Sequence, residues 1–368
     1  MNFSIKYRPI TLSEIKGHDK VIKDLTKRSK NNDFPQTMMF SGKTGNGKTS
    51  LTRIIAKNIL CQHKDEKGNS CNSCELCMSI DQEKLSFQYF EYNASNLGID
   101  EMRAIEEQAT KKVLGQSQKK VIVIDELQEL GSNRKAMKNI LKILEKPLKN
   151  TFFILGTMEE WRVDKSIKNR SVPYRLHDLD TKTILDYLIY VCDKEKVIID
   201  TPDKANVLVA LANYSNGSMR TAVSLLERVV YSEIWNPEDA LKELGILTDD
   251  KLISIVNGIL TGDVSVLENK ITEDLLDRIN DILNTYFKVL SGLKNTNFVY
   301  RDNLQGITKV SIETVTYTIS KLNELMKFIY LKPNLIEFVI LDIINNNKIK
   351  QIKEEKFDEI PKRRRINL

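Results

Sequence analysis

The sequence predicts an α/β domain with a parallel sheet, followed by regions that are entirely helical. Three observations carry this prediction. A glycine-rich loop at 42–49 lies between an apolar run and a helix-compatible run, and a β-branched run at 120–124 ends in two carboxylates. Strand-like runs alternate with helical stretches up to residue 179 and then fade. Such alternation is typical of βαβ units, which build parallel sheets.

The glycine-rich loop is a complete G-x-x-x-x-G-K-[ST] motif with a short apolar run before it and a helical run after it. Glycines let backbone amides curl around a phosphate chain, Lys48 reaches the β- and γ-phosphates, and the Thr49 hydroxyl can ligate Mg²⁺. A glycine loop can match by chance, but these flanks favour nucleotide binding. We expect ATP to be bound by Gly42, Lys43, Thr44, Gly45, Asn46, Gly47, Lys48, Thr49 and Ser50.

The acidic pair Asp125–Glu126 ends the β-branched run at 120–124. Such a run suits a strand that is buried on both faces of a parallel sheet. Ligands bind at the carboxyl ends of these strands. Asp125 is therefore expected to hold Mg²⁺ with Thr49, and Glu126 to orient and deprotonate the attacking water. An apolar run ending in Asp-Glu is weak alone, but about 75 residues after a phosphate loop it predicts hydrolysis.

Four of the five cysteines, Cys61, Cys71, Cys74 and Cys77, fall within 17 residues. This clustering predicts a metal site rather than disulfides, and four thiolates suit a closed, structural Zn²⁺ site. An iron–sulfur cluster is the chemical alternative, and His63 is a competing ligand. Cys192 lies in an apolar run and is expected to be a core residue.

Composition restricts the class of protein. The chain has 368 residues, 41% hydrophobic and 29% charged, which indicates a globular protein of two or three domains. No apolar run approaches the roughly 18 residues of a membrane span, and the N-terminus has no secretory apolar region. We expect a cytoplasmic protein, in a bacterium or in the host of a virus. The net charge of +6 is concentrated at 346–368, which carry +4, so DNA contacts would need local patches.

Strands are expected at 37–40, 87–92, 120–124 and 152–156. Helices are expected at 181–195, at 203–232, over much of 238–292 and at 311–345. These elements divide the chain into a nucleotide domain (1–179) with an insertion at 58–82, a helical lid (180–238), a helical collar for oligomerisation (239–345) and a flexible basic tail (346–368). A solvated charge run is an equally good interpretation of that tail.

The ordered motifs resemble the clamp-loader branch of the AAA+ ATPases, and most closely its bacterial DNA polymerase III gamma/tau family. The resemblance covers roughly 1–235 and continues as a helical region. The elements that carry it, beside the two nucleotide motifs, are the Tyr7-Arg8-Pro9 arm, Ile15-Lys16-Gly17-His18, the four-cysteine insertion, 91–103, and the stretch at 139–147, which resembles the family's Asn-x-Leu-Leu-Lys-x-Leu-Glu-x-Pro.

The resemblance implies a fold and further site residues. The fold would be an α/β AAA+ nucleotide domain with a zinc-binding insertion, then an all-α lid and an all-α collar. Tyr7, Arg8 and Pro9 would lie beside the adenine. Thr157 would be the sensor that polarises the attacking water, and Arg220, in Gly-Ser-Met-Arg, would reach the γ-phosphate from the lid. Arg170 would be the finger that reaches a neighbouring subunit's γ-phosphate; a surface arginine is the alternative.

The resemblance also implies a function. The chain would be an ATPase motor subunit that opens a sliding clamp and loads it on primer–template DNA during replication, with ATP, Mg²⁺ and Zn²⁺ as cofactors. Its partners would be other loader subunits in a pentamer-type assembly, the clamp and the DNA, with no membrane. The alternatives are a helicase-type AAA+ motor and a non-hydrolysing structural subunit of a loader.

Overall fold

The computed structural model describes residues 2–82, 87–111, 119–132, 134–145, 150–246, 249–268, 273–292, 303–328 and 335–358. The chain divides into two compact units, Met1–Ala240 and Leu241–Leu368, which we describe separately. Among the described helices, none is long and apolar enough to cross a membrane.

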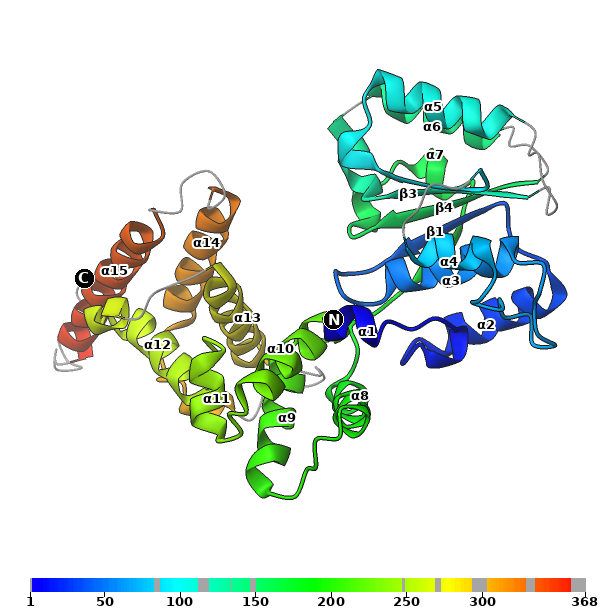
Figure 1. Ribbon diagram of the computed structural model, residues 1–368. Helices are drawn as coiled ribbons and strands as arrows, with labels where there is room; N and C mark the ends of the chain where they lie inside the picture. The colour runs from blue at the N-terminus through cyan, green and yellow to red at the C-terminus, as the bar shows by residue number, and fades with distance from the viewer. Residues whose placement is uncertain are drawn as a thin grey trace. The chain divides into compact units, whose positions relative to one another are not determined.

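The first unit is built on a five-stranded sheet in which every neighbouring pair of strands is parallel (Figure 1). The strand order β2-β3-β4-β1-β5 places the strand before the phosphate loop next to β4 and leaves β3 between β2 and β4. The strands are β1 (Thr37–Ser41), β2 (Tyr89–Asn93), β3 (Lys120–Asp125), β4 (Thr151–Thr157) and β5 (Val172–Arg175).

The first four strands lie at the predicted positions to within two residues, whereas β5 was not predicted. β5 has four residues, includes Pro173, and shows a mostly exposed pattern. Proline cannot donate to a strand ladder and is confined to edges such as this one. Arg175 at its end forms two hydrogen bonds of 2.8 Å with Glu160. These hydrogen bonds, together with one from Ser41, lower the pKa of Glu160 although its burial raises it.

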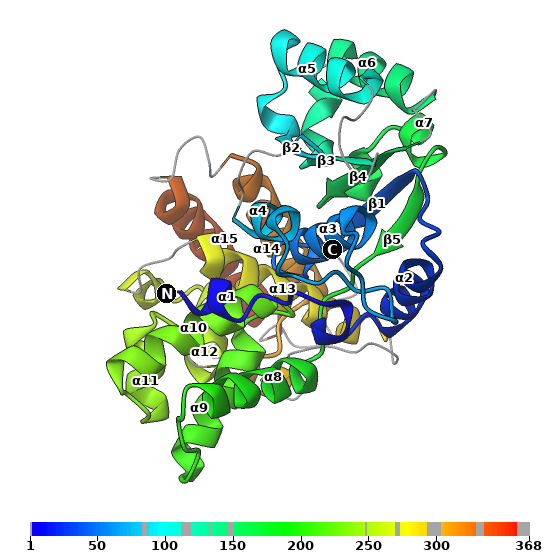
Figure 2. The same ribbon diagram turned by 45° about the vertical axis from the view of Figure 1, so that its right-hand side comes forward.

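Helices cover both faces of the sheet, as Figures 1 and 2 show. In β3, Val121 and Val123 pack into one core with α3, whereas Ile122 and Ile124 pack into the other. A strand that is apolar on both faces reads as a continuous β-branched run, which is why the sequence predicted it. The helices are α2 (Asp19–Asn31) and α3 (Lys48–Leu60) on the first face, and α5 (Ile99–Thr110) and α6 (Arg134–Glu145) on the second.

Helices complete the first unit after β5. Each long helix begins at a side-chain cap: Asp180 accepts from Thr183, Thr201 from Lys204, and Ser218 from Thr221. Caps of this kind satisfy backbone N–H groups that the first turn leaves unpaired. The remaining helices of this unit are α1 (Phe3–Lys6), α4 (Glu75–Asp81), α7 (Lys165–Lys168), α8 (Thr181–Lys194), α9 (Pro202–Tyr214) and α10 (Met219–Ser232). The first unit ends within α11 (Pro237–Glu243).

The second unit is helical throughout its described residues, as predicted for the collar. Its helices share one apolar core that includes Val256, Ile279, Leu322 and Ile340. They are α12 (Asp249–Thr261), α13 (Glu273–Leu290), α14 (Ile312–Phe328) and α15 (Leu335–Asp358).

The predicted start of the tail at residue 346 is wrong, because α15 continues to Asp358. Asn347 is fully buried, and its amide donates to the Ile259 carbonyl (2.9 Å) and the Thr318 hydroxyl (3.0 Å). The polar run at 345–347 resembles a loop in sequence, but one of its asparagines is a core residue. The basic run at 362–365 lies outside the described residues.

Candidate nucleotide-binding site

The phosphate loop joins the carboxyl end of β1 to the first turn of α3. Gly45 and Gly47 have φ angles of 84° and 95°, which side chains rarely adopt. At Gly45 a Cβ atom would also lie 2.0 Å from the Oγ and 3.1 Å from the Cβ of Ser218, so the residue that caps α10 would have to shift to admit a side chain. The loop therefore requires glycine at these positions.

One pocket collects most of the predicted site residues. It lies against the phosphate loop and is also lined by the N-terminal arm, the end of β3 and the start of α10. The predicted residues that line it are Tyr7, Arg8, Pro9, Thr44, Gly45, Asn46, Gly47, Lys48, Thr49, Ser50, Asp125, Glu126 and Arg220. Four predicted residues are not among those described as lining it: Gly42, Lys43, Thr157 and Arg170.

Lys48 is buried and its ammonium group lies inside the loop. Its Nζ donates to the carbonyl oxygens of Gly42 (2.6 Å) and Lys43 (3.0 Å). Burial lowers the pKa of Lys48, while the charges of Asp125 and Glu126 act in the opposite direction. A phosphate chain would supply negative charge to this buried cation.

The two carboxylates at the end of β3 face the same pocket. The backbone N–H of Glu126 donates to the Asp125 Oδ1 at 2.9 Å. Glu126 has a φ of 55°, in the left-handed region that is uncommon for a non-glycine residue. This turn carries the chain from β3 into a 3₁₀ helix at Leu127–Ser132, and it keeps both carboxylates at the strand end.

Thr157 ends β4 and is fully buried. Its hydroxyl donates to Gln128 Oε1 (2.8 Å), and its carbonyl oxygen accepts from the Gly42 N–H (3.2 Å). Gln128 in turn donates to the Glu126 carboxylate. Sequence reasoning missed Gln128, because its only signal is its position two residues after Glu126.

The N-terminal arm is tied to the helices that follow the sheet. The Tyr7 hydroxyl donates to Glu195 (2.5 Å), and the Tyr187 hydroxyl donates to the Tyr7 carbonyl oxygen (2.6 Å). Burial, and then the bond to Glu195, raises the pKa of Tyr7. His18 caps α2 in a left-handed conformation, and its Nε2 lies 3.2 Å from the Asn46 carbonyl oxygen. The arm thus frames one wall of the pocket.

Asp178 is a second residue that sequence reasoning missed. It accepts from Lys43 (2.7 Å) and from the Asn46 amide (2.9 Å), so it braces the phosphate loop from the segment after β5. Although burial raises the pKa of Asp178, these two donors lower it overall. Gly217, just before α10, packs against Asp178 so closely that a Cβ atom would lie 2.5 Å from the Asp178 Cβ. Asp178 therefore links the loop to the segment that carries Arg220.

Arg170 does not join this pocket. It follows α7, where its guanidinium donates to Glu145 (2.7 Å) and to the Ser166 carbonyl oxygen (2.9 Å). The arginine side chain is about one-third exposed, at 35%. Arg170 is not among the described residues that line its own chain's pocket, and it forms a partly exposed ion pair with Glu145.

The four clustered cysteines meet in space. Their Sγ atoms all lie within 4.8 Å of one another, and His63 is not part of the group found among the described residues. Tetrahedral zinc with Zn–S bonds of about 2.3 Å needs thiolates about this close. Backbone N–H groups of Cys71 and Cys74 already donate to sulfur, at 3.4 and 3.3 Å. Hydrogen bonds, first from the Ser73 backbone, lower the pKa of Cys71 to about 6, which favours a thiolate, whereas burial raises the pKa of Cys77.

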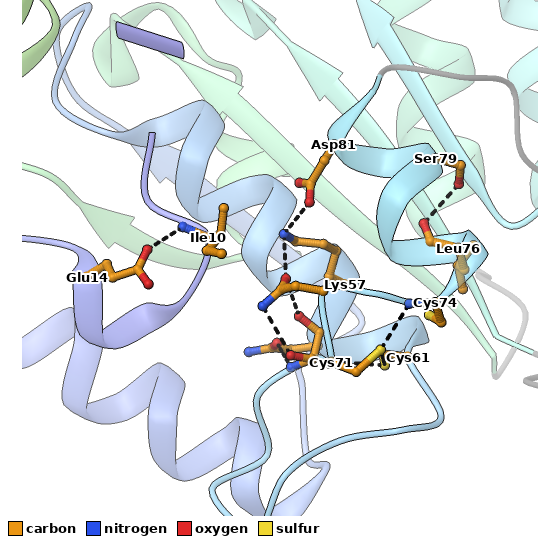
Figure 3. A network of polar contacts seen from close by, with 12 residues as sticks. Ile10, Glu14, Lys57, Cys61, Cys71, Cys74, Leu76, Ser79 and Asp81 are labelled. Carbon is orange, nitrogen blue, oxygen red and sulfur yellow. Dashed lines mark hydrogen bonds and ion pairs between the residues drawn. The ribbon is translucent and has the colours of Figure 1, made fainter. Parts of the chain in front are cut away.

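Lys57 anchors the cysteine insertion to the phosphate-loop helix (Figure 3). Its side chain is 1% exposed, and its Nζ donates to Asn72 (2.8 Å) and to Asp81 (2.9 Å). Asn72 lies between the clustered cysteines and Asp81 ends α4. One buried ammonium therefore holds the insertion loop and α4 against α3. Cys192 is buried in α8, away from the cluster, as a core residue.

Comparisons with known proteins agree with the motifs. A family described as "DNA polymerase III, delta subunit" matches residues 17–180. DNA polymerase III subunit tau of Bacillus subtilis is 27% identical over 311 residues, 84% of this chain and 52% of that protein. The gamma/tau subunit of Mycoplasma genitalium is 29% identical over 327 residues, 86% of this chain and 52% of that protein. The chain thus spans about half the length of these relatives.

Two further matches cover a larger share of the matched protein. The DNA polymerase III subunit gamma of Buchnera aphidicola is 28% identical over 291 residues, 77% of this chain and 76% of that protein. Among solved structures, the RuvB Holliday junction branch migration motor of Thermotoga maritima has a TM-score of 0.47 and 17% identity, covering 86% of this chain and 91% of that one.

The predicted fold class is confirmed: a parallel α/β domain with a four-cysteine insertion is followed by helices alone in the described residues. The matches to curated proteins cover most of the chain, beyond the phosphate loop that many ATPases share. By these matches the chain is similar to the bacterial DNA polymerase III gamma/tau subunits, the family that its motifs resemble.

Proposed function

We propose that this chain is a Mg²⁺-dependent ATPase subunit of a clamp loader, which opens a sliding clamp and places it on primer–template DNA. One observation carries the ATPase part of the proposal. Residues from segments far apart in the sequence, among them Lys48, Glu126 and Arg220, line a single pocket at the carboxyl ends of β1 and β3. Ligands bind at this edge of open parallel sheets.

The pocket has the groups that phosphoryl transfer to water requires. Lys48 and the loop amides would bind the β- and γ-phosphates, and Arg220 would approach from α10. Thr49 and Asp125 would hold Mg²⁺, whose charge would offset that of the phosphate oxygens. Glu126 would orient the attacking water and accept its proton. Tyr7, Arg8 and Pro9 would lie beside the base.

A structural zinc ion is the second part of the proposal. The donor set fits, because four sulfur atoms lie within 4.8 Å of one another and two of them already accept backbone hydrogen bonds. Cys61, Cys71, Cys74 and Cys77 would fill a tetrahedral shell, with no open position for a substrate. The ion would staple the insertion to α3, where Lys57 already anchors it.

The partners follow from the relationship to gamma/tau subunits and from Arg170. This arginine does not line its own chain's pocket, so we propose that it completes the site of a neighbouring subunit. We therefore expect a pentamer-type assembly with other loader subunits, and we propose the sliding clamp and primer–template DNA as its substrates.

ATP turnover measured with and without the sliding clamp and primed DNA tests this function. Strong stimulation by clamp and DNA together is the expected result, because a loader uses ATP only when both substrates are present. The Glu126→Gln variant is the control for contaminating activity. Stimulation by DNA alone would instead indicate a helicase-type motor. Tight ATP binding without turnover under any condition would indicate a structural subunit.

A further inference from the structure

Gln128 stands between two residues with proposed catalytic roles. It lies in the 3₁₀ helix that follows β3, two residues after Glu126, and only 2% of the residue is exposed. Its amide nitrogen donates to Glu126 Oε2. Its amide oxygen accepts from the Thr157 hydroxyl (2.8 Å) and from the Met158 backbone N–H (3.1 Å). One buried amide thus connects the ends of two neighbouring strands.

These contacts allow only one orientation of the amide. The Met158 N–H can donate but cannot accept, so it must face the oxygen of Gln128 rather than its NH₂ group. The NH₂ group then faces Glu126, whose carboxylate accepts it. Exchanging the two ends would place the NH₂ group against the Met158 N–H, a donor facing a donor, and the amide oxygen against the Glu126 carboxylate.

The same contacts engage Thr157. A threonine hydroxyl has a single hydrogen, and here that hydrogen points to Gln128. If Thr157 is to donate to a phosphate or to the attacking water, it must first give up this bond. The Met158 N–H would then hold the Gln128 oxygen alone. A change in the hydrogen bonding of Thr157 therefore reaches Glu126 through a single side chain, that of Gln128.

We propose that Gln128 is a positioning residue for ATP hydrolysis: its amide sets the orientation of the Glu126 carboxylate and couples that orientation to Thr157. This inference rests on the proposed ATPase function and adds a residue to it. Gln128 is not among the described residues that line the pocket, whereas its partner Glu126 is, so Gln128 acts through Glu126 rather than on the nucleotide.

The test compares variants of the full chain with the sliding clamp and primed DNA. Gln128→Ala removes the amide and should lower turnover by about 10- to 100-fold while ATP affinity stays within about twofold. Gln88→Ala is the matched control, because Gln88 donates to the Lys119 carbonyl oxygen (3.1 Å) at the opposite end of the strands. It should leave turnover unchanged.

The pH profile of turnover in the Gln128→Glu variant distinguishes a positioning role from a merely structural one, because a merely structural role would not shift it. This variant keeps an oxygen for Thr157 and Met158 but places a second carboxylate against Glu126. Like charges disfavour ionisation, so the acidic limb of the turnover profile should move to higher pH by about one unit. The melting temperature of each variant shows that it is folded. In a Glu126→Gln background, Gln128→Ala should cost less than about threefold, because its effect passes through Glu126.

Several outcomes would overturn the inference. If Gln128→Ala matches Gln88→Ala, if ATP affinity falls in parallel with turnover, or if Gln128→Glu leaves the pH profile in place, Gln128 does not position Glu126. These outcomes leave the ATPase function intact, because wild-type turnover is measured beside them. A wild-type chain that never hydrolyses ATP would remove the proposed function and this inference together.

Discussion

At the scale of single residues, the groups that we propose to bind the nucleotide and those that we propose to hydrolyse it lie on different segments of the chain. Lys48 lies within the glycine loop, where its ammonium group donates to two loop carbonyl oxygens. Glu126 stands apart from this loop, at a left-handed turn after β3 and bonded to Gln128. The two functions should therefore be separable by mutation.

Lys48→Ala should weaken ATP binding by roughly 10- to 100-fold, because it removes a charge-assisted contact to the phosphates. Glu126→Gln should retain binding and lower turnover by about 10²- to 10⁴-fold, since it removes the proton acceptor but keeps the shape of the side chain. Equilibrium binding of a fluorescent ATP analogue and steady-state hydrolysis distinguish the two effects. Equal loss of binding in both variants would contradict this division of roles.

At the scale of elements, the cysteine insertion is the part of the first unit that depends most on a few polar contacts. It leaves α3 at Cys61 and returns through α4. Lys57 holds it from inside, with bonds to Asn72 and Asp81. Burying an ammonium group is costly, and Lys57 has only a neutral amide and a carboxylate that is 36% exposed to offset that cost. A metal ion would therefore add a large share of the stability of this insertion.

One zinc ion per chain is therefore expected, with sulfur distances of about 2.3 Å. Removal by a chelator should lower the melting temperature, because binding free energy of a structural metal is folding free energy. Cys71→Ser should lose most of the zinc, whereas Cys192→Ser, at the cysteine outside the cluster, should keep it. Elemental analysis of the purified chain measures this. Less than half an equivalent of zinc per wild-type chain would contradict the zinc proposal, and iron in its place would indicate an iron–sulfur cluster.

At the scale of the whole molecule, we expect the proposed active site to need an arginine from a neighbouring subunit. Arg170 is held by Glu145 and the Ser166 carbonyl oxygen, and it is not among the described residues that line the pocket. An arginine that meets transition-state charge contributes on the order of 10³–10⁵ in rate in GTPases. The isolated chain should consequently hydrolyse ATP slowly and gain activity in an assembly.

Mixed assemblies test whether Arg170 acts in trans. Arg170→Ala subunits and Lys48→Ala subunits should each be inactive alone, for different reasons. When they are combined, some interfaces pair an intact ATP site with an intact arginine, so partial turnover should return. Size-exclusion chromatography confirms that mixed assemblies form. Full activity of the dilute wild-type monomer, or no recovery in stable mixtures, would show that Arg170 has another role.

Much of this protein was determined by local sequence pattern. The strand at 120–124, the glycine loop and the cysteine spacing each reflect a constraint that acts within a short stretch: burial on both faces, positive φ, or four thiols that meet in space. Such constraints restrict residue type directly, so they are readable without a structure. The relationship to gamma/tau subunits followed from the order of these motifs.

The tertiary structure decided what depends on contacts between distant segments. Gln128 and Asp178 resemble ordinary surface residues in sequence, but one meets Thr157 and the other meets Asn46. The edge strand β5 has only four, mostly exposed residues, so its sequence shows no alternation of apolar and polar residues that would predict a strand. Asn347 sits in a polar run, and only the packing of α15 against α12 and α14 makes it a core residue. Side-chain hydrogen bonds across long sequence separations leave no local pattern, so these features could not be predicted from the sequence.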